Sequence, residues 1–415
     1  MNSSEGANPH AGLVLGADGN YYGTTEYGGT NNCGTAFQLT CAGTLKTLAS
    51  FNFTNGAYPV AGLALGPNGN FYGTTCCGGV CNFGTVFMVS PGGTLTSLVS
   101  FNSTNGAYPE GGVVLGTNGN FYGTTFRGGT NDQGTVFQMT SDGTLTSLLS
   151  FTSANTNFFT NGFNPPDGLT MGADGNFYGI NYIGGAIFEG TVFKMTPAGV
   201  LSSVVSMSYQ NGSPVASPVQ GKDGNVYASG SGGSGNIFKL TPAGAQTTLY
   251  TFSGGDGSTP TAGLVQGNDG NFYGSTLYGG ANGQGVVFQM MPAGVLSDLF
   301  SFSATNGSGP DAALIQGANG AFYGTTSSGG SLGGGNIFEI SRMAPSFLPV
   351  VPPAGVSTFH WTAVVGQTYQ VLYTTNLIQP VWNDLGDAIT ATNVVMSLMD
   401  FAPQDPQRFY RVILQ

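Results

Sequence analysis

A seven-residue segment, Gly69-Asn70-Phe71-Tyr72-Gly73-Thr74-Thr75, returns fifty residues later as Gly119–Thr125 with every residue identical. Repetition at a fixed period constrains the fold strongly, because each copy becomes one structural unit that packs on its neighbours. In every copy a tyrosine follows two residues after the position that Asn70 occupies in this segment. That position recurs seven times, at Asn20, Asn70, Asn120, Asn176, Asn225, Asn271 and Ala321.

Each copy contains four short runs rich in Val, Phe, Tyr and Thr and bounded by Gly, Pro or Asn, which is typical of β-strands. In the second copy these runs are Gly62–Leu65, Asn70–Thr75, Gly84–Ser90 and Thr94–Phe101. An Asn-Gly or Asp-Gly pair, a favoured hairpin turn, joins the first two runs. No stretch shows helical periodicity, and the 71 glycines would destabilise a helix. Seven copies of a four-stranded antiparallel unit predict an all-β chain built on a seven-bladed β-propeller.

The predicted propeller occupies residues 1–343, and a Pro-rich linker follows over 344–355. The last copy ends before its fourth strand, so we expect either Ser346–Val351 or the first eight residues to complete that sheet. Alternating runs in residues 356–415 predict a small β-sandwich. The seven repeats lie near residues 9–58, 59–108, 109–164, 165–213, 214–259, 260–309 and 310–343.

The repeated pattern Gly-Asn-Phe-Tyr-Gly-Thr-Thr, Gly-Gly, Gly-Thr-Val-Phe, Gly-Thr-Leu and Ser-Phe resembles the tandem GloVer repeats of exported bacterial proteins. The resemblance covers roughly residues 9–341. The last 60 residues are similar to small β-sandwich modules at the C-termini of exported bacterial proteins. These resemblances imply a propeller and an extracellular or cell-surface location. They name no catalytic residue, because the repeat family is recognised by its repeats and not by an activity.

Composition narrows the choice of partners. Lys and Arg together number 8 against 19 Asp and Glu, so the net charge is −11. So few basic residues cannot neutralise a nucleic-acid backbone or bind an anionic membrane surface. No apolar run is long enough to span a bilayer, which predicts no membrane insertion. The start, Met1–Gly6, lacks the regions of a signal peptide, so for an exported protein we expect the signal to be missing from this chain.

Five cysteines lie in the first two repeats. Cys33, Cys76, Cys77 and Cys81 belong to loops expected on one face, whereas Cys41 belongs to the other. A four-thiolate metal site usually has Cys-x-x-Cys spacing, which is absent, so no metal is predicted there. We favour disulfides that join Cys33 to one member of the Cys76/Cys77 pair and the other member to Cys81. Free, buried thiols are the remaining alternative.

The loops between second and third strands share a face with the connections between repeats, and their residues differ from copy to copy. A rigid scaffold with variable loops is a common way to build a binding surface. Exposed aromatic rings flanked by Asn, Thr and Gly suit the flat faces of sugar rings. The alternative is that these side chains pack loop against loop. The candidate ligand-binding residues are Glu26, Tyr27, Phe126, Arg127, Tyr182 and Tyr278.

A second candidate site surrounds the expected central channel. His10, Glu110 and Asp311 each follow a proline at the start of an innermost strand, and Asp167 lies one place further along its strand. We expect all four at the channel mouth, with Asp311 near His10 because the seventh repeat adjoins the first. Two carboxylates a few ångströms apart can cleave a glycosidic bond as acid and base. The same residues would otherwise bind a cation or solvate the rim.

These patterns favour an exported, non-enzymatic recognition protein that holds a glycan or another surface polymer on its loop-rich face. One alternative is a polysaccharide hydrolase or lyase that uses Glu110, Asp311, Asp167 and His10. Another is a structural subunit that self-associates in an extracellular assembly. No cofactor is predicted, and a cation bound at the channel mouth is the alternative.

Overall fold

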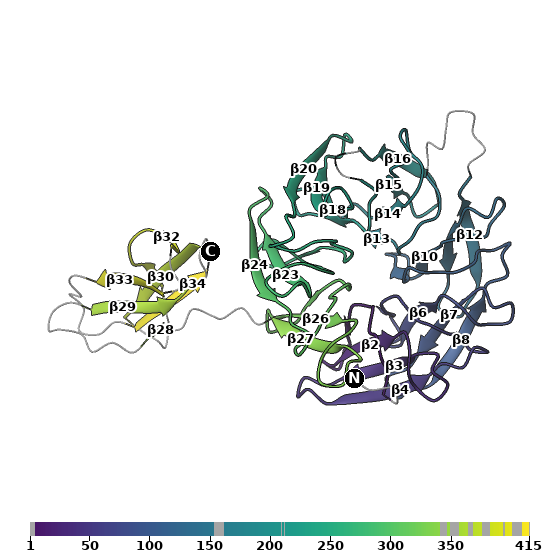
Figure 1. Cartoon of the computed structure of the whole chain (residues 1–415), viewed down its shortest axis with the longest axis horizontal. Helices are drawn as coiled ribbons and strands as arrows, with labels where there is room; N and C mark the ends of the chain where they lie inside the picture. The colour runs from purple at the N-terminus through teal and green to yellow at the C-terminus, as the bar shows by residue number, and fades with distance from the viewer. Residues whose placement is uncertain are drawn as a thin grey trace. The chain divides into compact units, whose positions relative to one another are not determined.

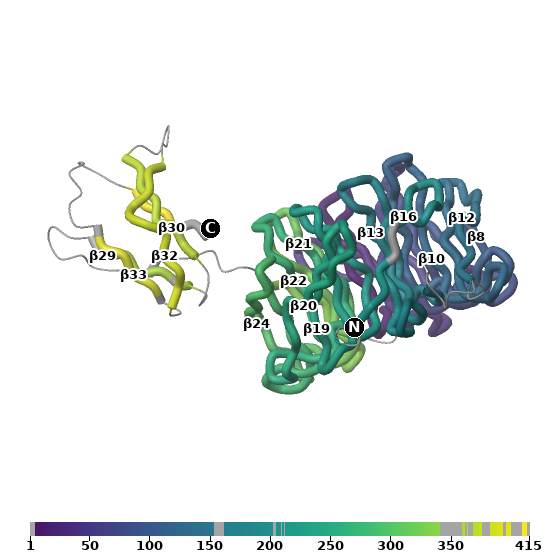
Figure 2. Tube along the Cα trace, turned by 90° about the horizontal axis from the view of Figure 1, so that it is seen from above, coloured from purple at the N-terminus to yellow at the C-terminus, as the bar shows by residue number. Residues whose placement is uncertain are grey.

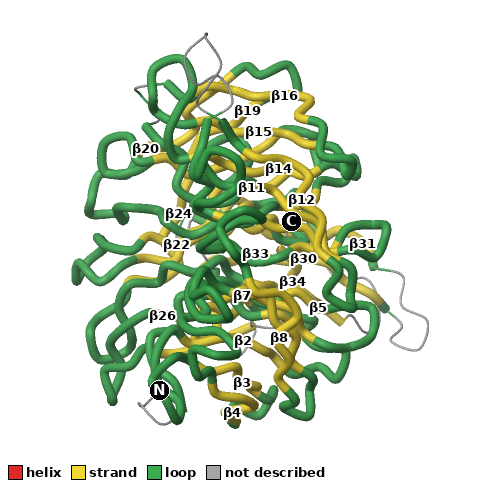
Figure 3. Tube along the Cα trace, turned by 90° about the vertical axis from the view of Figure 1, so that its right-hand side faces the viewer, coloured by secondary structure: helices red, strands yellow, loops and turns green. Residues whose placement is uncertain are grey.

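The computed structural model describes residues 5–152, 162–208, 210, 212–340, 347–348, 357–363, 368–375, 382–392, 395–400 and 409–414. All regular structure in these residues is β, and none of them is helical (Figure 3). The chain divides into two compact units, Met1–Ile340 and Ser341–Gln415.

The first unit repeats one antiparallel sheet, as the sequence predicts. Its described residues form six sheets of four strands in sequential order and one sheet of three. The strands of the first four sheets are β1 Val14–Leu15, β2 Tyr21–Thr25, β3 Thr35–Leu39, β4 Leu45–Ser50; β5 Ala64–Leu65, β6 Phe71–Thr75, β7 Thr85–Val89, β8 Leu95–Ser100; β9 Val114–Leu115, β10 Phe121–Thr125, β11 Thr135–Met139, β12 Leu145–Ser150; β13 Thr170–Met171, β14 Phe177–Asn181, β15 Thr191–Met195, β16 Leu201–Ser206. Those of the last three are β17 Val219–Gln220, β18 Val226–Gly230, β19 Asn236–Leu240, β20 Gln246–Thr251; β21 Val265–Gln266, β22 Phe272–Thr276, β23 Val286–Met290, β24 Leu296–Ser301; β25 Ile315–Gln316, β26 Phe322–Thr326, β27 Asn336–Ile340.

The strands of each sheet run between two ends of the unit (Figure 2). Because each sheet is a meander, the tight turns after its first and third strands share one end, which we call the turn end. The longer loop after the second strand and the connection to the next sheet share the other, the loop end. The two ends therefore carry different kinds of residue.

In six of the seven sheets a glycine in the second strand makes room for the phenylalanine opposite it, and in the fifth sheet Ala228 takes that place opposite Phe238. Gly23 pairs with Phe37, and a Cβ on Gly23 would lie 2.6 Å from the Cζ atom of that ring. The ring therefore crosses the strand at the glycine and is itself buried. Gly73 and Phe87 repeat the arrangement in the second sheet, with 2.7 Å between the same atoms. This explains why a glycine and a phenylalanine recur together at these two positions in six of the seven copies.

Neighbouring sheets are joined by aromatic stacking. The tyrosine of one sheet packs on the ring that opens the second strand of the next, and such pairs contribute about 0.5–1.5 kcal/mol beyond their buried area. Ring centroids lie 3.9 Å apart in Tyr22–Phe71, 4.1 Å in Tyr72–Phe121, 4.2 Å in Tyr122–Phe177, 4.0 Å in Tyr227–Phe272 and 3.9 Å in Tyr273–Phe322.

The last sheet contacts the first. Figure 1 shows the sheets in a ring, with β2 and β3 beside β26 and β27. The hydroxyl of Thr325 donates to the carbonyl of Ala11 at 3.2 Å, and the amide of Asn8 donates to Gly334 at 3.0 Å. Thr74 makes the equivalent bond to Gly111 between the second and third sheets. The contact between the first and last sheets therefore reproduces an ordinary contact between neighbouring sheets.

The missing fourth strand of the last sheet is not supplied by Phe347–Leu348. Those residues form β28 and pair with β29 in the second unit, so the prediction that Ser346–Val351 completes the sheet is wrong for them. The rest of that segment, the linker 344–355 apart from β28, and the first four residues lie outside the described residues. Ala7 pairs instead with Tyr27 in the first sheet.

The second unit contains two antiparallel sheets in its described residues. Trp361 is fully buried and shares a core with Tyr369 and Val371 from the other sheet. The strands are β28 Phe347–Leu348, β29 Ser357–Thr362 and β33 Val395–Asp400 in one sheet, and β30 Thr368–Thr374, β31 Asn383–Asp384, β32 Ile389–Thr390 and β34 Phe409–Leu414 in the other.

Candidate functional site

The loop end has a fixed backbone with variable side chains. In six sheets the residue two places beyond the second strand forms an antiparallel bridge with the segment that leads into that sheet. In the first sheet, the amide of Ala7 donates to the carbonyl of Tyr27 at 2.9 Å, and the reverse bond is 3.1 Å. The bridged pairs are Ala7–Tyr27, Ala57–Cys77, Ala107–Arg127, Phe163–Ile183, Ser258–Tyr278 and Ser308–Ser328.

Three of the predicted ligand-binding residues are exposed at this end. Tyr27, Tyr182 and Tyr278 are 38 %, 47 % and 56 % exposed, so none is buried by packing against a neighbouring loop. Arg127 is also exposed and lies 3.5 Å from Asp132. Phe126 is half-buried, with the Arg127 guanidinium 5.8 Å from its ring centre.

A groove of about 620 Å³ opens at the loop end between the second and third sheets. Its aromatic wall is Phe83 and Tyr108, whose rings meet edge to face at 5.6 Å. Its polar wall includes Arg127, Asp132 and Asn131. We call this the loop groove. Only Arg127 was among the residues predicted from the sequence.

Tyr108 sits in a left-handed backbone conformation, with φ of 54°, and Tyr58 does the same in the preceding sheet at 58°. The equivalent residues elsewhere include Asn8, Asn164 and Gly309, types that tolerate this conformation, and Thr259, which adopts it at a φ of 59°. A bulky residue there costs about 1–3 kcal/mol, and such strain concentrates at functional sites. The repeated Gly-Ala-Tyr-Pro segments are the sequence signal that would have drawn attention to both tyrosines.

The four residues predicted for the channel mouth do line one cavity, of about 400 Å³. They come from different sheets: His10, Glu110, Asp167 and Asp311. They differ in their partners: His10 and Asp167 are held by other groups of the protein, whereas within the described residues Glu110 and one oxygen of Asp311 are not.

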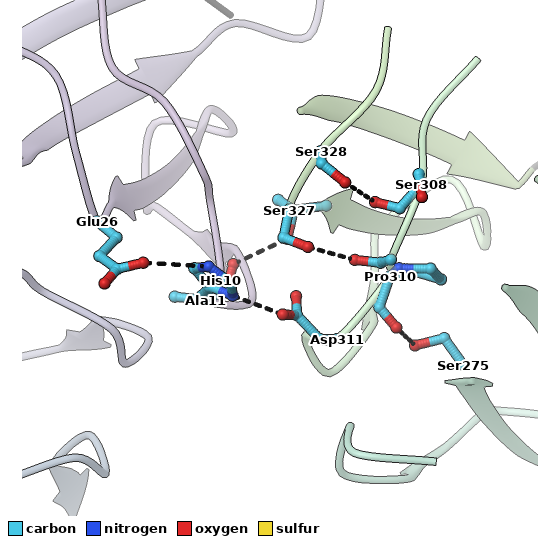
Figure 4. A network of polar contacts seen from close by, with 11 residues as sticks. His10, Ala11, Glu26, Ser275, Ser308, Pro310, Asp311, Ser327 and Ser328 are labelled. Atoms are coloured by element: carbon cyan, nitrogen blue, oxygen red, sulfur yellow. Dashed lines mark hydrogen bonds and ion pairs between the residues drawn. The ribbon is translucent and has the colours of Figure 1, made fainter. Parts of the chain in front are cut away.

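His10 joins two carboxylates (Figure 4). Its Nδ1 lies 2.5 Å from Oδ2 of Asp311, and its Nε2 lies 3.2 Å from Oε2 of Glu26. Hydrogen bonds with Asp311 and then Glu26 outweigh burial and raise the pKa of His10 from 6.5 to about 10. Although burial raises the pKa of Glu26, the hydrogen bond from His10 leaves it below its usual value. His10 is therefore a cation that links the first sheet to the last.

Asp167 is committed to the backbone. One carboxylate oxygen accepts from the amide of Ser217 in the next sheet at 2.7 Å, and the other accepts from Gly168 at 2.7 Å. Glu110 makes no side-chain hydrogen bond in the described part of the chain, and burial raises its pKa while Arg127 opposes the shift. Oδ1 of Asp311 is buried without a partner there. Glu110 and this oxygen are thus the uncommitted groups of the four.

All five cysteines are free, so the predicted disulfides among Cys33, Cys76, Cys77 and Cys81 are not formed. The thiol of Cys33 is buried and donates to the carbonyl of Asn31 at 3.2 Å, within its own loop. The sulfur atoms of Cys76 and Cys77 lie 3.3 Å apart, and burial raises the pKa of Cys76. No group of three His, Cys, Asp or Glu side chains in the described ranges is arranged to hold a metal ion.

Comparison with known families identifies the repeat. The model of the Gloeobacter/Verrucomicrobia repeat matches three overlapping stretches, residues 1–162, 116–264 and 228–379. The chain therefore belongs to the Gloeobacter/Verrucomicrobia repeat family, as the resemblance to GloVer repeats predicts. No curated protein matches the chain.

Solved structures similar to this chain show the β-propeller fold. The extracellular domain of a protein described as a hybrid two-component system from B. thetaiotaomicron aligns with a TM-score of 0.54 and 12 % identity, over 100 % of this chain and 56 % of that one. Puromycin hydrolase aligns with a TM-score of 0.52 and 14 % identity, over 88 % of this chain and 60 % of that one. The chain thus spans little more than half the length of each, and at these identities the likeness concerns the fold alone. No helix in the described residues is long and apolar enough to cross a membrane.

Proposed function

We propose that this protein is an exported, non-enzymatic recognition protein that binds a glycan or a similar surface polymer at the loop end of its propeller. The observation that carries the proposal is the loop groove, where a strained tyrosine and a second aromatic ring face charged and amide side chains. The surrounding backbone is fixed by the bridges at the loop end. A rigid groove of this kind loses little conformational entropy when it binds.

The chemistry of the groove suits a carbohydrate. The rings of Phe83 and Tyr108 offer flat apolar surface for the C–H face of a sugar. Arg127 donates in a planar fork, Asp132 accepts, and the amide of Asn131 does both, which matches the alternating hydroxyls of a saccharide. Binding sites commonly combine an apolar surface with a few placed polar groups in this way.

A neighbouring aromatic group favours a polymer over a single sugar. In the first two sheets, Tyr58 contacts Tyr27 at 5.5 Å and Phe53 at 5.6 Å between ring centres. Tyr27 and Phe53 are both exposed. Tyr58 and Tyr108 hold equivalent positions one repeat apart, so two similar aromatic surfaces follow each other around the ring. Linked weak sites of this kind gain affinity for a repeating ligand.

The proposal includes the scaffold. The seven sheets would form a complete seven-bladed propeller closed by the Thr325–Ala11 and His10–Asp311 contacts. The second unit would be a β-sandwich with an accessory or sorting role. Fractionation of the native organism tests export, since a protein found only in the cytosol would contradict it.

Electrophoresis through native gels, each with one embedded polysaccharide, tests the binding function. We expect at least one polysaccharide to retard the protein, with no clearing of the gel behind the band. Free migration in every gel would contradict the proposal.

A second function remains a candidate because Glu110 and Asp311 share one cavity and Glu110 has a raised pKa. A polysaccharide hydrolase or lyase would use Glu110 as the acid. It would leave a cleared zone in the gel, and Glu110→Gln would abolish that zone. A recognition protein would show the same retardation with Glu110→Gln as without it. A structural subunit, the third alternative, would instead show concentration-dependent assembly by light scattering.

A further inference from the structure

One interface between sheets lacks the ring that the others have. In five interfaces, a tyrosine stacks on the phenylalanine that opens the second strand of the next sheet, with centroids 3.9–4.2 Å apart. Between the fourth and fifth sheets the tyrosine is present as Tyr178, but the residue that should meet it is Val226. No ring in the described residues stacks on Tyr178. At this one interface the repeat therefore has a smaller, non-aromatic side chain in place of the ring.

A cavity of about 250 Å³ lies at this position, lined by Tyr178 and Val226 among others. Tyr178 is 6 % exposed, whereas its counterparts Tyr122 and Tyr227 are 0 % and 1 % exposed. Its remaining apolar wall includes Val205 and Leu240. A cavity of about 150 Å³ lined by apolar side chains is large enough to bind benzene. The space is thus sufficient for one or two fused rings.

The polar rim of the cavity carries no net charge. The ammonium of Lys194 lies 2.7 Å from Oδ2 of Asp174, and Tyr178 donates its hydroxyl to the same oxygen at 2.9 Å. Lys194 also lies 5.6 Å from the centre of the Tyr178 ring. Gln220 completes the rim. An ion pair that is already satisfied favours a neutral ligand, because a charged one would have to compete with it.

The next interface provides a filled reference. Tyr227, Asp223, Lys239 and Gln266 occupy the positions that correspond to Tyr178, Asp174, Lys194 and Gln220. There Phe272 takes the place of Val226, and its ring stacks on Tyr227 at 4.0 Å. The two interfaces share their polar groups and differ at this ring, as well as at Val205, whose counterpart is Tyr250. The ligand of the open interface should therefore resemble the ring that fills the closed one.

We propose that the cavity between the fourth and fifth sheets binds a small, neutral, planar aromatic compound, which stacks on Tyr178 in the place of the missing phenylalanine. A hydroxyl or ring N–H on such a compound would reach the rim formed by Asp174 and Gln220. The cavity lies at the turn end, since Gly224, Thr241 and Pro242 line it, and so is distinct from the loop groove. The proposal does not depend on the glycan function.

Indole serves as the probe, with glucose as a ring-shaped compound that has no aromatic face. Saturation-transfer NMR on the full chain should show transfer to indole and none to glucose. Val226→Phe should restore the stack, weaken indole binding at least tenfold and raise the Tm. If Val226→Phe fails to fold, Val226→Leu, which fills the cavity in part, should still weaken binding severalfold.

Phe272→Val tests the same idea by opening the reference interface. We expect this variant to bind about two equivalents of indole where the wild-type protein binds one. The absence of transfer to indole in the wild-type protein would overturn the proposal. Unchanged binding by a folded Val226→Phe or Val226→Leu, or a single equivalent bound by a folded Phe272→Val, would overturn it as well.

Discussion

The imidazole of His10 lies 2.5 Å from the carboxylate of Asp311, although 301 residues separate them in the sequence. The two side chains meet where the first sheet contacts the last, and the carboxylate of Glu26 lies 3.2 Å from the other ring nitrogen, Nε2. The contact thus adds a charged link between the first and last sheets, which no chain segment connects directly, beside the backbone hydrogen bond from Asn8 to Gly334. The same two residues line the cavity at the channel mouth, and we assign their interaction primarily to stabilising the contact between the two sheets.

This closure predicts that stability falls in alkaline solution. The pKa of His10 is raised from 6.5 to about 10, so folding favours the protonated imidazole. Its contribution is complete below pH 6.5 and is lost as the pH rises through 10. Urea unfolding of the wild-type protein should show a decline across that window, of about 1–3 kcal/mol in total. His10→Gln should lose stability at pH 7 and change little between pH 7 and pH 10, whereas equal declines in both proteins would contradict this account.

The hydroxyl of Thr325 is predicted to contribute to the same closure. Thr325→Val leaves the carbonyl of Ala11 without its bond, which should cost about 1 kcal/mol in urea unfolding. Thr74→Val removes the equivalent bond to Gly111 and should cost a similar amount. Thr146→Val, at an exposed position on β12, is the control and should change stability by less than about 0.5 kcal/mol. A neutral Thr325→Val would show that the first and last sheets are not joined in this way.

Asp167 should matter for stability and not for ligand binding. Asp167→Ala removes the acceptor for two backbone amides, those of Ser217 and Gly168, and should cost about 1–3 kcal/mol. Asp167→Asn keeps one carbonyl oxygen and should lose less. Both folded variants should migrate like the wild-type protein in polysaccharide gels. Loss of a polysaccharide-clearing activity with unchanged stability would instead assign Asp167 to catalysis.

The cysteines should react according to their burial. Unfolded, unreduced protein should titrate with five thiols, since all five are free. In the folded protein, iodoacetamide should modify the exposed Cys41 and Cys81 first. Cys33 is buried, and burial raises the pKa of Cys76, so both should react slowly at neutral pH. A count of one thiol would show that two disulfides had formed.

The sequence predicts the sheets well because the same local pattern recurs in each of the seven repeats. The glycine at position 23 and the phenylalanine at position 37, for example, recur together in each of the first four copies, and the structure shows that the ring crosses its neighbouring strand at the glycine. The sequence also brings His10 near Asp311, because ring closure follows from counting repeats. Side-chain direction is different, since nothing local indicates that the thiol of Cys33 turns to its own loop.

Two features escaped prediction for different reasons. Tyr108 is important through its backbone conformation, which a residue name does not reveal, and its partner Phe83 comes from the preceding sheet. Val226 on its own gives no signal, because valine is a common residue in β-strands. Its meaning appears only when the structure shows a ring in the same place at the other interfaces.

The central claim, recognition of a polymer at the loop groove, is tested most directly by affinity electrophoresis of Tyr108→Ala in the gel that retards the wild-type protein. Phe300→Ala is the control, since Phe300 is an aromatic residue that is exposed on the outer strand β24 and does not line the loop groove. The account predicts that Tyr108→Ala migrates nearly as fast as in a gel without polysaccharide, while Phe300→Ala is retarded like the wild-type protein. Equal retardation of all three proteins would place binding elsewhere and contradict the claim.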